Sequence, residues 1–359
     1  MNNNRSVSNV MSELTLNGSK DSFIEDINTN ISLINKRIKK DLKIVSMNVG
    51  VYSRTKISII YISSIADIRV IKNIKKRIKN INIDAIIDSS YLKHALEDEK
   101  NFFPTIMETE RPDKTCMALM EGKVVIVVDN SPYALILPSL FLDFFHSPDD
   151  YYQKSFNTTF IRIIRIISFL VAIFLPGIFI SITTRNYNIV PLPLLLMFKA
   201  GRSYVPFPAY IEALFMIISF EILKEGDFRM SHAASSSISI LGGLILGDAA
   251  VAAGIVSPIM IIIIAISSIA GLIFSSQELV NCIRIYKIIC LVLSSILGIC
   301  GTIICLVIII FNLFNTRIFG YNYLDYDLHE LLDSIILINT KIWKRNSKIT
   351  KNVIRGKYK

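Results

Sequence analysis

Acidic side chains inside apolar segments are the residues of this sequence whose type and position best suit chemistry. Asp248 lies in a stretch of small and apolar residues, 242–254, that carries no other charge. A carboxylate near the centre of a bilayer costs about 2.5–3.5 kcal/mol even on the lenient insertion scale, so it needs water or a partner there. Two interpretations stay open: Asp248 faces a water-filled ion path, or it pairs with a buried donor in tightly packed helices.

The small residues around Asp248 predict close contact between helices. Gly243 and Gly247 are four positions apart, and Gly254 follows in the same run. Small residues at this spacing let two helix backbones approach each other closely. We therefore expect these three glycines to serve helix packing.

Glu212 is the second candidate for an ion pathway. Glu212 and Glu221 are nine residues apart, roughly two and a half helical turns, so they point to opposite faces of one helix. Glu221 lies close to Lys224 and is expected at the membrane interface, whereas Glu212 lies deeper. Lys199 and Arg202 can pair with Glu212 or reach lipid headgroups, and the headgroup interpretation is favoured.

No pattern in the sequence indicates an enzyme. Neither a G-x-S-x-G motif nor a Walker motif is present. The five cysteines include no C-x-x-C pair, and the four histidines are scattered along the chain. We therefore expect no catalytic residues, no metal site and no cofactor.

The net charge of +10 could indicate a nucleic-acid-binding protein. The lysines and arginines, however, flank apolar segments, and no basic patch interleaved with aromatic residues accompanies them. Such charges are typical of a membrane surface, where they contact anionic lipids and set topology. Membrane lipids are therefore the expected partner, and nucleic acid is not.

The elements that must position these residues fall into two classes. The chain is 52% hydrophobic with a mean hydropathy of +0.49, more than a soluble domain of this size tolerates, and the apolar residues are concentrated after about residue 155. The predicted fold is an α/β soluble N-terminal domain followed by an all-α multi-spanning transmembrane domain. The expected divisions are a polar lead over 1–40, the soluble domain over 41–155, the transmembrane domain over 156–315 and a basic tail over 316–359.

Alternating apolar runs and one amphipathic pattern support the α/β assignment. The predicted elements are a short helix over 31–40, strands over 43–50 and 56–62, helices over 67–79 and 90–99, a short apolar run over 84–88, a helix that opens at Pro112, and a hairpin over 123–137.

The second half of the chain holds several apolar segments. The predicted ones are 163–182, 210–223, 238–256, 259–274 and 288–311, the last as the longest uninterrupted span. Arg162, at the start of the first, is expected to reach headgroups. The proline-broken segment 191–201 is expected to be re-entrant or interfacial.

The charges near the chain ends predict the topology. The tail over 341–359 is strongly basic and carries no acid, which places it in the cytoplasm, and the basic N-terminal domain shows no export signal. Both termini on one side require an even number of crossings, so four or six fit.

Long ordered motifs lie between about Asp41 and Leu324. They are Thr109–Lys114, with Glu110, Arg111, Pro112, Asp113 and Lys114, then Leu119–Val124, Ser147–Tyr152, Pro191–Leu196, Val205–Ala209 after Arg202, Glu212–Leu214, Phe220–Leu223 and Gly247–Pro258. Together these motifs resemble the A subunit of GerA-type spore germinant receptors.

The resemblance implies a protein of the spore inner membrane that triggers germination when nutrients are sensed. It implies action with a B-type, transporter-like subunit and a C-type lipoprotein subunit, and homo-oligomerisation into a cation channel. The sequence departs from the family pattern in four places. They are the short lead before Asp41, the segment Met230–Ser237 and the site near Ser275, where family members usually carry proline, and the residues after Gly320. The alternatives are a non-conducting scaffold, a SpoVAF-like accessory germination protein, and a secondary transporter.

Overall fold

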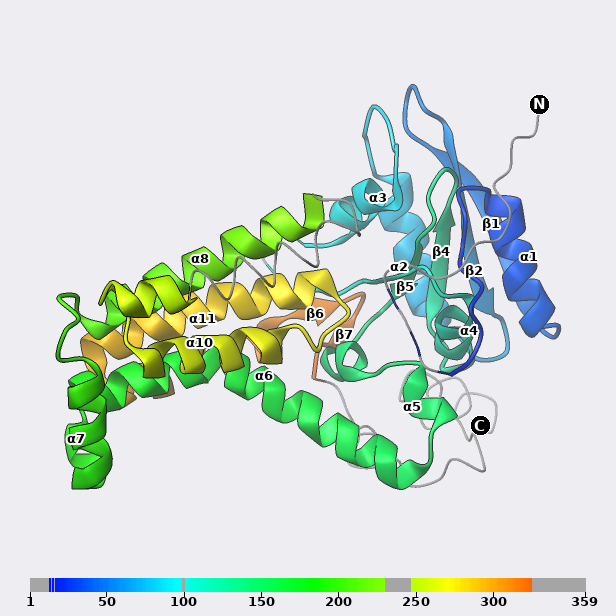
Figure 1. The fold of residues 1–359 in the computed structure, drawn as a ribbon. Helices are drawn as coiled ribbons and strands as arrows, with labels where there is room; N and C mark the ends of the chain where they lie inside the picture. Colours follow the sequence, from blue (N-terminus) through cyan, green and yellow to red (C-terminus); the bar gives the residue numbers. More distant parts are fainter. Residues whose placement is uncertain (1–12, 14, 16, 99–100, 230–246, 325–359) are drawn as a thin grey trace. The chain divides into compact units, whose positions relative to one another are not determined.

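The computed structural model of the 359-residue chain describes residues 13, 15, 17–98, 101–229 and 247–324 (Figure 1). The chain forms two compact units. The N-terminal unit contains the described residues up to Ile164 together with Ser275–Leu279 and the segment from Asn312 onward. The helical unit contains Arg165–Phe274, apart from residues 230–246, and Val280–Phe311.

A five-stranded antiparallel sheet forms the centre of the N-terminal unit. Its order is β1-β2-β4-β5-β3. The strands are β1 (Leu42–Val49), β2 (Thr55–Ile62), β3 (Met107–Thr109), β4 (Val124–Val128) and β5 (Ala134–Leu137). The central strand β4 consists of five apolar residues and is buried at every position, as expected of a strand covered on both faces.

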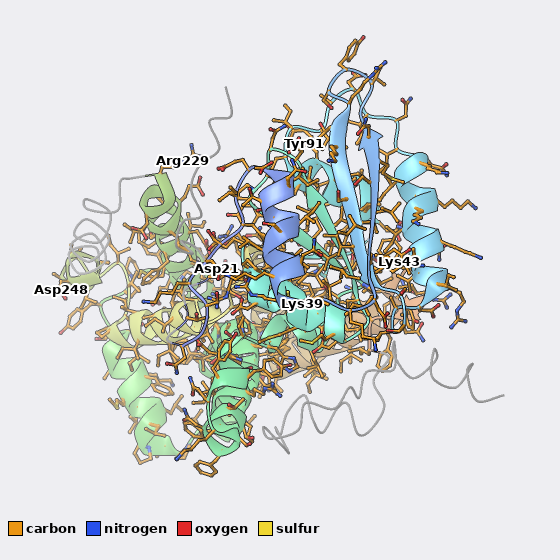
Figure 2. The ribbon with its side chains drawn as sticks, turned by 90° about the vertical axis from the view of Figure 1, so that its right-hand side faces the viewer. Asp21, Lys39, Lys43, Tyr91, Arg229 and Asp248 are labelled. Carbon is orange, nitrogen blue, oxygen red and sulfur yellow. The ribbon has the colours of Figure 1, made fainter. Side chains whose placement is uncertain are left out.

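Helices cover both faces of this sheet. Helices α1 (Ile27–Arg37) and α4 (Pro112–Met120) contact each other and the central strands, whereas α2 (Ile68–Lys79) contacts α3 (Ser89–Leu96). In Figure 2, α1 and α2 lie on opposite sides of the sheet. A short 3-10 helix, η1 (Phe141–Phe145), and α5 (Asp149–Tyr152) complete the unit.

Most of the predicted elements of this unit are confirmed. Strands β1 and β2, helix α2, helix α3, the helix that opens at Pro112 and the hairpin of β4 and β5 lie where the sequence predicts them. The apolar run over 84–88 forms no strand. The sheet instead contains β3, which pairs with β5 at one edge. Three residues are too few for a recognisable alternation, which is why β3 escaped prediction.

The residues just before the expected boundary at residue 40 are part of the N-terminal unit. Helix α1 begins at Ile27 behind the capping side chain of Asp26, ahead of the predicted helix over 31–40. Ile27 and Ile34 are buried, and the amide of Phe23 donates to Glu110 O at 2.8 Å. The apolar residues of this segment are separated by Asn, Ser and Thr, so its average composition is polar although one face packs into the core.

The helical unit is built from long helices with few charges. They are α6 (Ser155–Thr184), α7 (Leu192–Gly201), α8 (Ala209–Arg229), helical residues 247–252, α10 (Pro258–Gly271), α11 (Gln277–Leu297) and α12 (Ile299–Asn315). Among the described helices, α6 and α11 are long and apolar enough to cross a membrane. Helices α7, α10 and α12 are also apolar but shorter.

The expectation of one uninterrupted span over 288–311 is wrong. The chain turns at Gly298, whose φ of +64° is in the left-handed region that favours glycine. A β-carbon there would collide with the side chain of Asn186, whose Oδ1 accepts a hydrogen bond from the amide of Ile299 at 3.0 Å. Both arms of the resulting hairpin, α11 and α12, are apolar, so hydropathy alone could not show the break.

Pro176 lies inside α6 and leaves one carbonyl without its helical donor. That carbonyl belongs to Ala172, four residues earlier. Ser267 of α10 donates its hydroxyl to Ala172 O at 2.9 Å, and Ser267 is buried. The interior proline thus creates an acceptor that joins α6 to α10.

Candidate functional site

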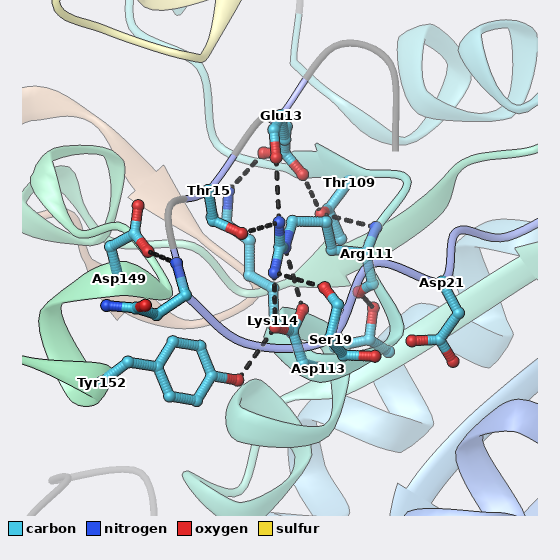
Figure 3. Close-up of polar contacts among 12 residues, drawn as sticks. Glu13, Thr15, Ser19, Asp21, Thr109, Arg111, Asp113, Lys114, Asp149 and Tyr152 are labelled. Atoms are coloured by element: carbon cyan, nitrogen blue, oxygen red, sulfur yellow. Dashed lines mark hydrogen bonds and ion pairs between the residues drawn. The ribbon is translucent and has the colours of Figure 1, made fainter. Parts of the chain in front are cut away.

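A buried polar cluster surrounds Arg111 in the N-terminal unit (Figure 3). Glu110 and Arg111 join β3 to α4: Arg111 is the N-cap, Pro112 occupies the first turn, and Asp113 is the acidic residue of that turn. Proline and an acid suit this end of a helix because its first amides lack internal partners. The local sequence therefore fixes where α4 begins and brings Arg111 and Asp113 together.

Arg111 is almost fully buried, and each of its five N–H donors has an acceptor. Its Nε and Nη2 donate to the two carboxylate oxygens of Asp113 at 3.0 and 2.6 Å. Its Nη1 donates to Glu13 O at 3.0 Å and to Thr15 Oγ1 at 2.6 Å, and Nη2 also donates to Ser19 O at 3.1 Å. A buried guanidinium with this full set of partners fastens the N-terminal segment to α4.

Glu13 is the second charged partner of this cluster, and no sequence signal marked it. Lys114 Nζ contacts Glu13 Oε1 at 2.6 Å, and Thr109 donates its hydroxyl to the other carboxylate oxygen. The amide of Glu13 donates to Glu110 Oε1 at 3.0 Å. Only the folded chain reveals these contacts, because about a hundred residues separate Glu13 from its partners.

Two of the motifs that suggested a family meet in this cluster. Tyr152, from the motif Ser147–Tyr152, donates its hydroxyl to Asp113 Oδ2 at 2.9 Å. Asp150, from the same motif, accepts a contact from Arg162 Nε at 3.2 Å, and both side chains are buried. The expectation that Arg162 reaches lipid headgroups is therefore wrong, because the carboxylate of Asp150, twelve residues earlier in the chain, lies within its reach.

Burial and the charges of the cluster shift the pKa values of Asp113 and Tyr152 away from neutral pH. Burial acts to raise the pKa of Asp113, but hydrogen bonds and charge from Arg111, with the Tyr152 hydroxyl, outweigh it and lower that pKa below its usual range. Burial and the nearby Asp113 carboxylate raise the pKa of Tyr152 to about 12. Neither group titrates near pH 7, so the cluster suits the fastening of segments rather than acid–base catalysis.

In the helical unit, Glu212 is buried and fully engaged. Its Oε1 accepts from Arg202 Nε at 3.0 Å, and the Arg202 Nη2 lies 2.8 Å away. Its Oε2 accepts from the amide and hydroxyl of Ser257 at 3.1 and 3.0 Å. Because Ser257 is the N-cap of α10, Glu212 joins the start of α10 to α8. The favoured headgroup contact for Arg202 is therefore wrong.

Asp248 stands in a different environment. It is exposed among the helical residues 247–252, and Figure 2 shows its side chain pointing outward from the drawn ribbon. Within the described part of the chain, no hydrogen bond or ion pair involves Asp248. The structure thus keeps the two predicted carboxylates, Asp248 and Glu212, in separate surroundings.

The three glycines expected to serve helix packing, Gly243, Gly247 and Gly254, also lie in different surroundings. A β-carbon at Gly247 would meet no atom within 4 Å, whereas one at Gly254 would lie 3.2 Å from Tyr204 O. Gly243 is outside the described residues. Of the two that can be placed, only Gly254 has a close neighbour within this single chain.

A further charged cluster, which the sequence did not suggest, lies at the start of α11. Lys93 of α3 is buried, and its Nζ contacts Glu278 and lies 3.3 Å from Glu108 Oε2. Glu278 occupies the first turn of α11. Among the described residues, no group of His, Cys, Asp and Glu is arranged to hold a metal ion.

Comparison with known proteins identifies the family. The model of the "Bacillus/Clostridium GerA spore germination protein" family matches residues 1–349. The chain belongs to the GerA family. The resemblance seen in the motifs is thereby confirmed.

Several GerA-family relatives are similar over most of this chain. Spore germination protein KA of Bacillus subtilis is 38% identical over 323 residues, which are 89% of this chain and 59% of the relative. Spore germination protein B1 of the same organism is 35% identical over 347 residues, 95% of this chain and 72% of the relative. The membrane protein YfkQ of B. subtilis is 37% identical over 323 residues, 89% and 63% respectively.

One solved structure is also similar. The N-terminal domain of the A subunit of the Bacillus megaterium spore germinant receptor GerK3 is 43% identical, covers 33% of this chain and 97% of that domain, and has a TM-score of 0.28. The chain spans only 59% of the length of germination protein KA.

Proposed function

We propose that this GerA-family chain is the membrane subunit of a spore germinant receptor and that its copies assemble into a nutrient-gated cation channel. The observation that carries the proposal is the family match over residues 1–349, which includes both the N-terminal unit and the helical unit. The proposed location is the spore inner membrane. The proposed partners are a B-type transporter-like subunit, a C-type lipoprotein subunit and membrane lipids.

The lengths of the helices support insertion into a bilayer. Helices α6 and α11 have 30 and 21 residues, which at about 1.5 Å per residue match or exceed a hydrocarbon core of about 30 Å. The chain leaves the N-terminal unit after Ile164, returns at Ser275–Leu279, leaves again and returns at Asn312. Two excursions that start and end at the same unit support an even number of crossings, four or six, with both termini on one side.

The environments of the two carboxylates favour Asp248 over Glu212 as the ion-pathway residue. Glu212 has its oxygens occupied by Arg202 and Ser257, so it is not available to a passing cation. Asp248 is exposed in the single chain. In a ring of subunits one Asp248 per copy would surround the axis, an arrangement that cation channels use.

Asp248→Asn tests this assignment. We expect normal accumulation of the full chain in the membrane but reduced cation release from spores given nutrients, because the amide removes the charge that attracts cations. Asp248→Glu should restore release, and Glu225→Gln, which alters another exposed carboxylate of the helical unit, should leave it unchanged. Loss of the protein from the membrane, or normal abundance with unchanged flux, would exclude Asp248 from the pathway.

A non-conducting scaffold is the second candidate, and the occupied state of Glu212 favours it. A buried carboxylate that joins α8 to α10 stabilises the helical unit without contributing to ion conduction, as expected of a scaffold. Purified full chain in liposomes separates the two functions. Cation flux through the purified chain supports the channel, whereas no flux together with dependence of the other receptor subunits on this chain for their accumulation supports the scaffold.

A further inference from the structure

Helix α2 carries a stripe of four lysines. Lys72, Lys75, Lys76 and Lys79, here called the α2 lysine stripe, stand at positions i, i+3, i+4 and i+7. Residues at these spacings are neighbours on one side of a helix. The helix contains no acidic residue, so every charge on its outer side is positive.

The packing of α2 holds this stripe at the surface. Val70, Ile71, Ile74 and Ile78 are the buried residues of the helix and fix its orientation against the core. Lys72, Lys76 and Lys79 are exposed, and Lys75 is half-buried with its ammonium 5.7 Å from the ring centroid of Tyr61. In Figure 2 the outer side of α2, at the right of the ribbon, has no other drawn helix or strand over it.

The fold leaves the charge of the stripe uncompensated. The two arginines of the helix have acidic partners: Arg69 contacts Asp67 at 3.0 Å, and Arg77 contacts Asp98 at 3.4 Å. Among the described residues, no ion pair involves the four lysines of the stripe. Like charges at i and i+4 repel each other, and the helix dipole relieves this only for the lysines in the last turn. The stripe therefore favours an anionic partner outside the N-terminal unit.

The segment that follows α12 brings this surface close to the end of an apolar helix. Helix α12 ends at Asn315, and four residues later Phe319 packs against α2. Asn73 Nδ2 donates to Phe319 O at 3.4 Å, and the Arg77 guanidinium lies 4.9 Å from the ring centroid of Phe319.

Chain length limits the separation between α2 and that helix. Four residues span at most about 14 Å when fully extended. Tyr321 adds a second attachment, because its hydroxyl donates to Asp67 Oδ2 at 2.8 Å. The helix that carries the stripe is thus tethered within a short distance of the point where α12 would leave a bilayer.

We propose that the α2 lysine stripe docks on anionic phospholipid headgroups of the bilayer that holds the helical unit. The proposal rests on the proposed membrane insertion but not on channel activity. Lysines near an anionic leaflet are attracted to it, and a tether of this length keeps the headgroups at a high effective concentration. Docking would fix how the N-terminal unit stands on the membrane surface.

The reactivity of the lysines in wild-type protein tests the proposal. Full-length chain is reconstituted in nanodiscs of phosphatidylcholine alone or with phosphatidylglycerol, and the acetylation rate of each lysine is measured by mass spectrometry. We expect all four lysines of the stripe, Lys75 included, to react about fivefold more slowly in the anionic nanodiscs at low salt. High salt should abolish the difference. The exposed Lys36, Lys39 and Lys40, around the end of α1, are the internal control and should react equally in both.

Matched variants give a second readout. Lys72→Gln/Lys76→Gln/Lys79→Gln should remove the lipid-dependent protection of the remaining Lys75. Lys36→Gln/Lys39→Gln/Lys40→Gln changes the net charge equally and should preserve it. Equal Lys75 protection in both variants would overturn the proposal.

Other outcomes separate the alternatives. Equal reactivity of the stripe in both lipids overturns the proposal, as does equal protection of the α1 lysines. Protection by duplex DNA in neutral nanodiscs, without any by anionic lipid, would instead show a nucleic-acid surface. Release of the chain from membranes by alkaline carbonate would refute membrane insertion itself, which is distinct from an inserted chain with an unprotected stripe.

Discussion

At the scale of single residues, two buried charged side chains of this protein, Arg111 and Glu212, have all their polar atoms engaged. Arg111 uses all five donors, and Glu212 accepts four contacts from two residues. Buried charges are tolerated only when their partners satisfy them, and removal of one partner leaves the other uncompensated. These clusters therefore join segments that are distant in the sequence, and their disruption should be costly.

Arg111→Met should destabilise the N-terminal unit by about 3–5 kcal/mol, because Asp113 would stay buried without its cation. The midpoint of thermal unfolding of the full chain in detergent, followed by circular dichroism, measures the effect. Arg69→Met is the control, since the Arg69 side chain is 73% exposed and its pair with Asp67 should contribute little. The double variant Arg111→Met/Asp113→Asn should be more stable than Arg111→Met alone. A less stable double variant would contradict the buried-pair account.

The lowered pKa of Asp113 predicts a dependence of stability on pH. A carboxyl with a lower pKa in the folded state stabilises it fully above the unfolded pKa of about 3.9 and loses that contribution as pH falls through the folded value. Wild type should therefore be more stable than Asp113→Asn at pH 6, and the difference should shrink below about pH 4. Thermal midpoints from pH 3 to 7 test this, with the exposed Asp84→Asn as control. A difference that stays constant over this range would refute the prediction.

At the scale of the elements, prolines and glycines decide how the helices meet. Pro176 releases the carbonyl of Ala172, which Ser267 satisfies from α10. Gly298 permits the turn between α11 and α12, and Asn186 supplies an acceptor to the first amide beyond it. Backbone groups inside a bilayer must be satisfied by protein, so these contacts suit a membrane environment.

Ser267→Ala should weaken the contact between α6 and α10, because the Ala172 carbonyl would lose its donor. We expect a loss of about 0.6–2 kcal/mol, the range for hydrogen bonds between helices in membranes. Ser268→Ala is a closely matched control, since Ser268 is adjacent on the same helix but only half-buried. Unfolding of the full chain in mixed micelles by increasing fractions of denaturing detergent measures both. Equal effects of the two substitutions would show that the hydrogen bond contributes nothing specific.

At the scale of the whole molecule, the chain returns to the N-terminal unit after each helical excursion. Ser275–Leu279 and the segment from Asn312 onward belong to that unit, and Lys93 contacts Glu278 while Tyr323 donates to Pro104 O at 2.6 Å. A chain that repeatedly re-enters one unit keeps its points of re-entry on the same side of a membrane. The proposed even number of crossings depends on this connectivity.

Single cysteines in a variant that lacks the five native ones test this topology. Leu297→Cys, beside the turn between α11 and α12, should react with an impermeant thiol reagent outside intact cells. Ser276→Cys and Arg317→Cys should react only after the membrane is permeabilised, because they lie in segments of the N-terminal unit. Labelling of Leu297→Cys and Arg317→Cys from the same side would refute the proposed hairpin.

The sequence by itself determined the division into a mixed N-terminal part and an apolar helical part, because average composition and local periodicity are properties of short windows. The start of α4 at Pro112, the amphipathic α2 and the hairpin of β4 and β5 followed from the same local signals. The motifs alone pointed to the GerA family, which the match over residues 1–349 confirmed.

Only the tertiary structure decided which groups meet the buried charges. Glu13 with Lys114, Asp150 with Arg162 and Glu212 with Ser257 are pairs whose energies depend on distance in space, and a local window contains no such distance. The break at Gly298 was hidden for a related reason, since apolar residues on both sides of a turn have the same hydropathy as one continuous span. The local sequence pattern predicted most helices and strands, whereas the packing of distant segments set the partners of each buried charge.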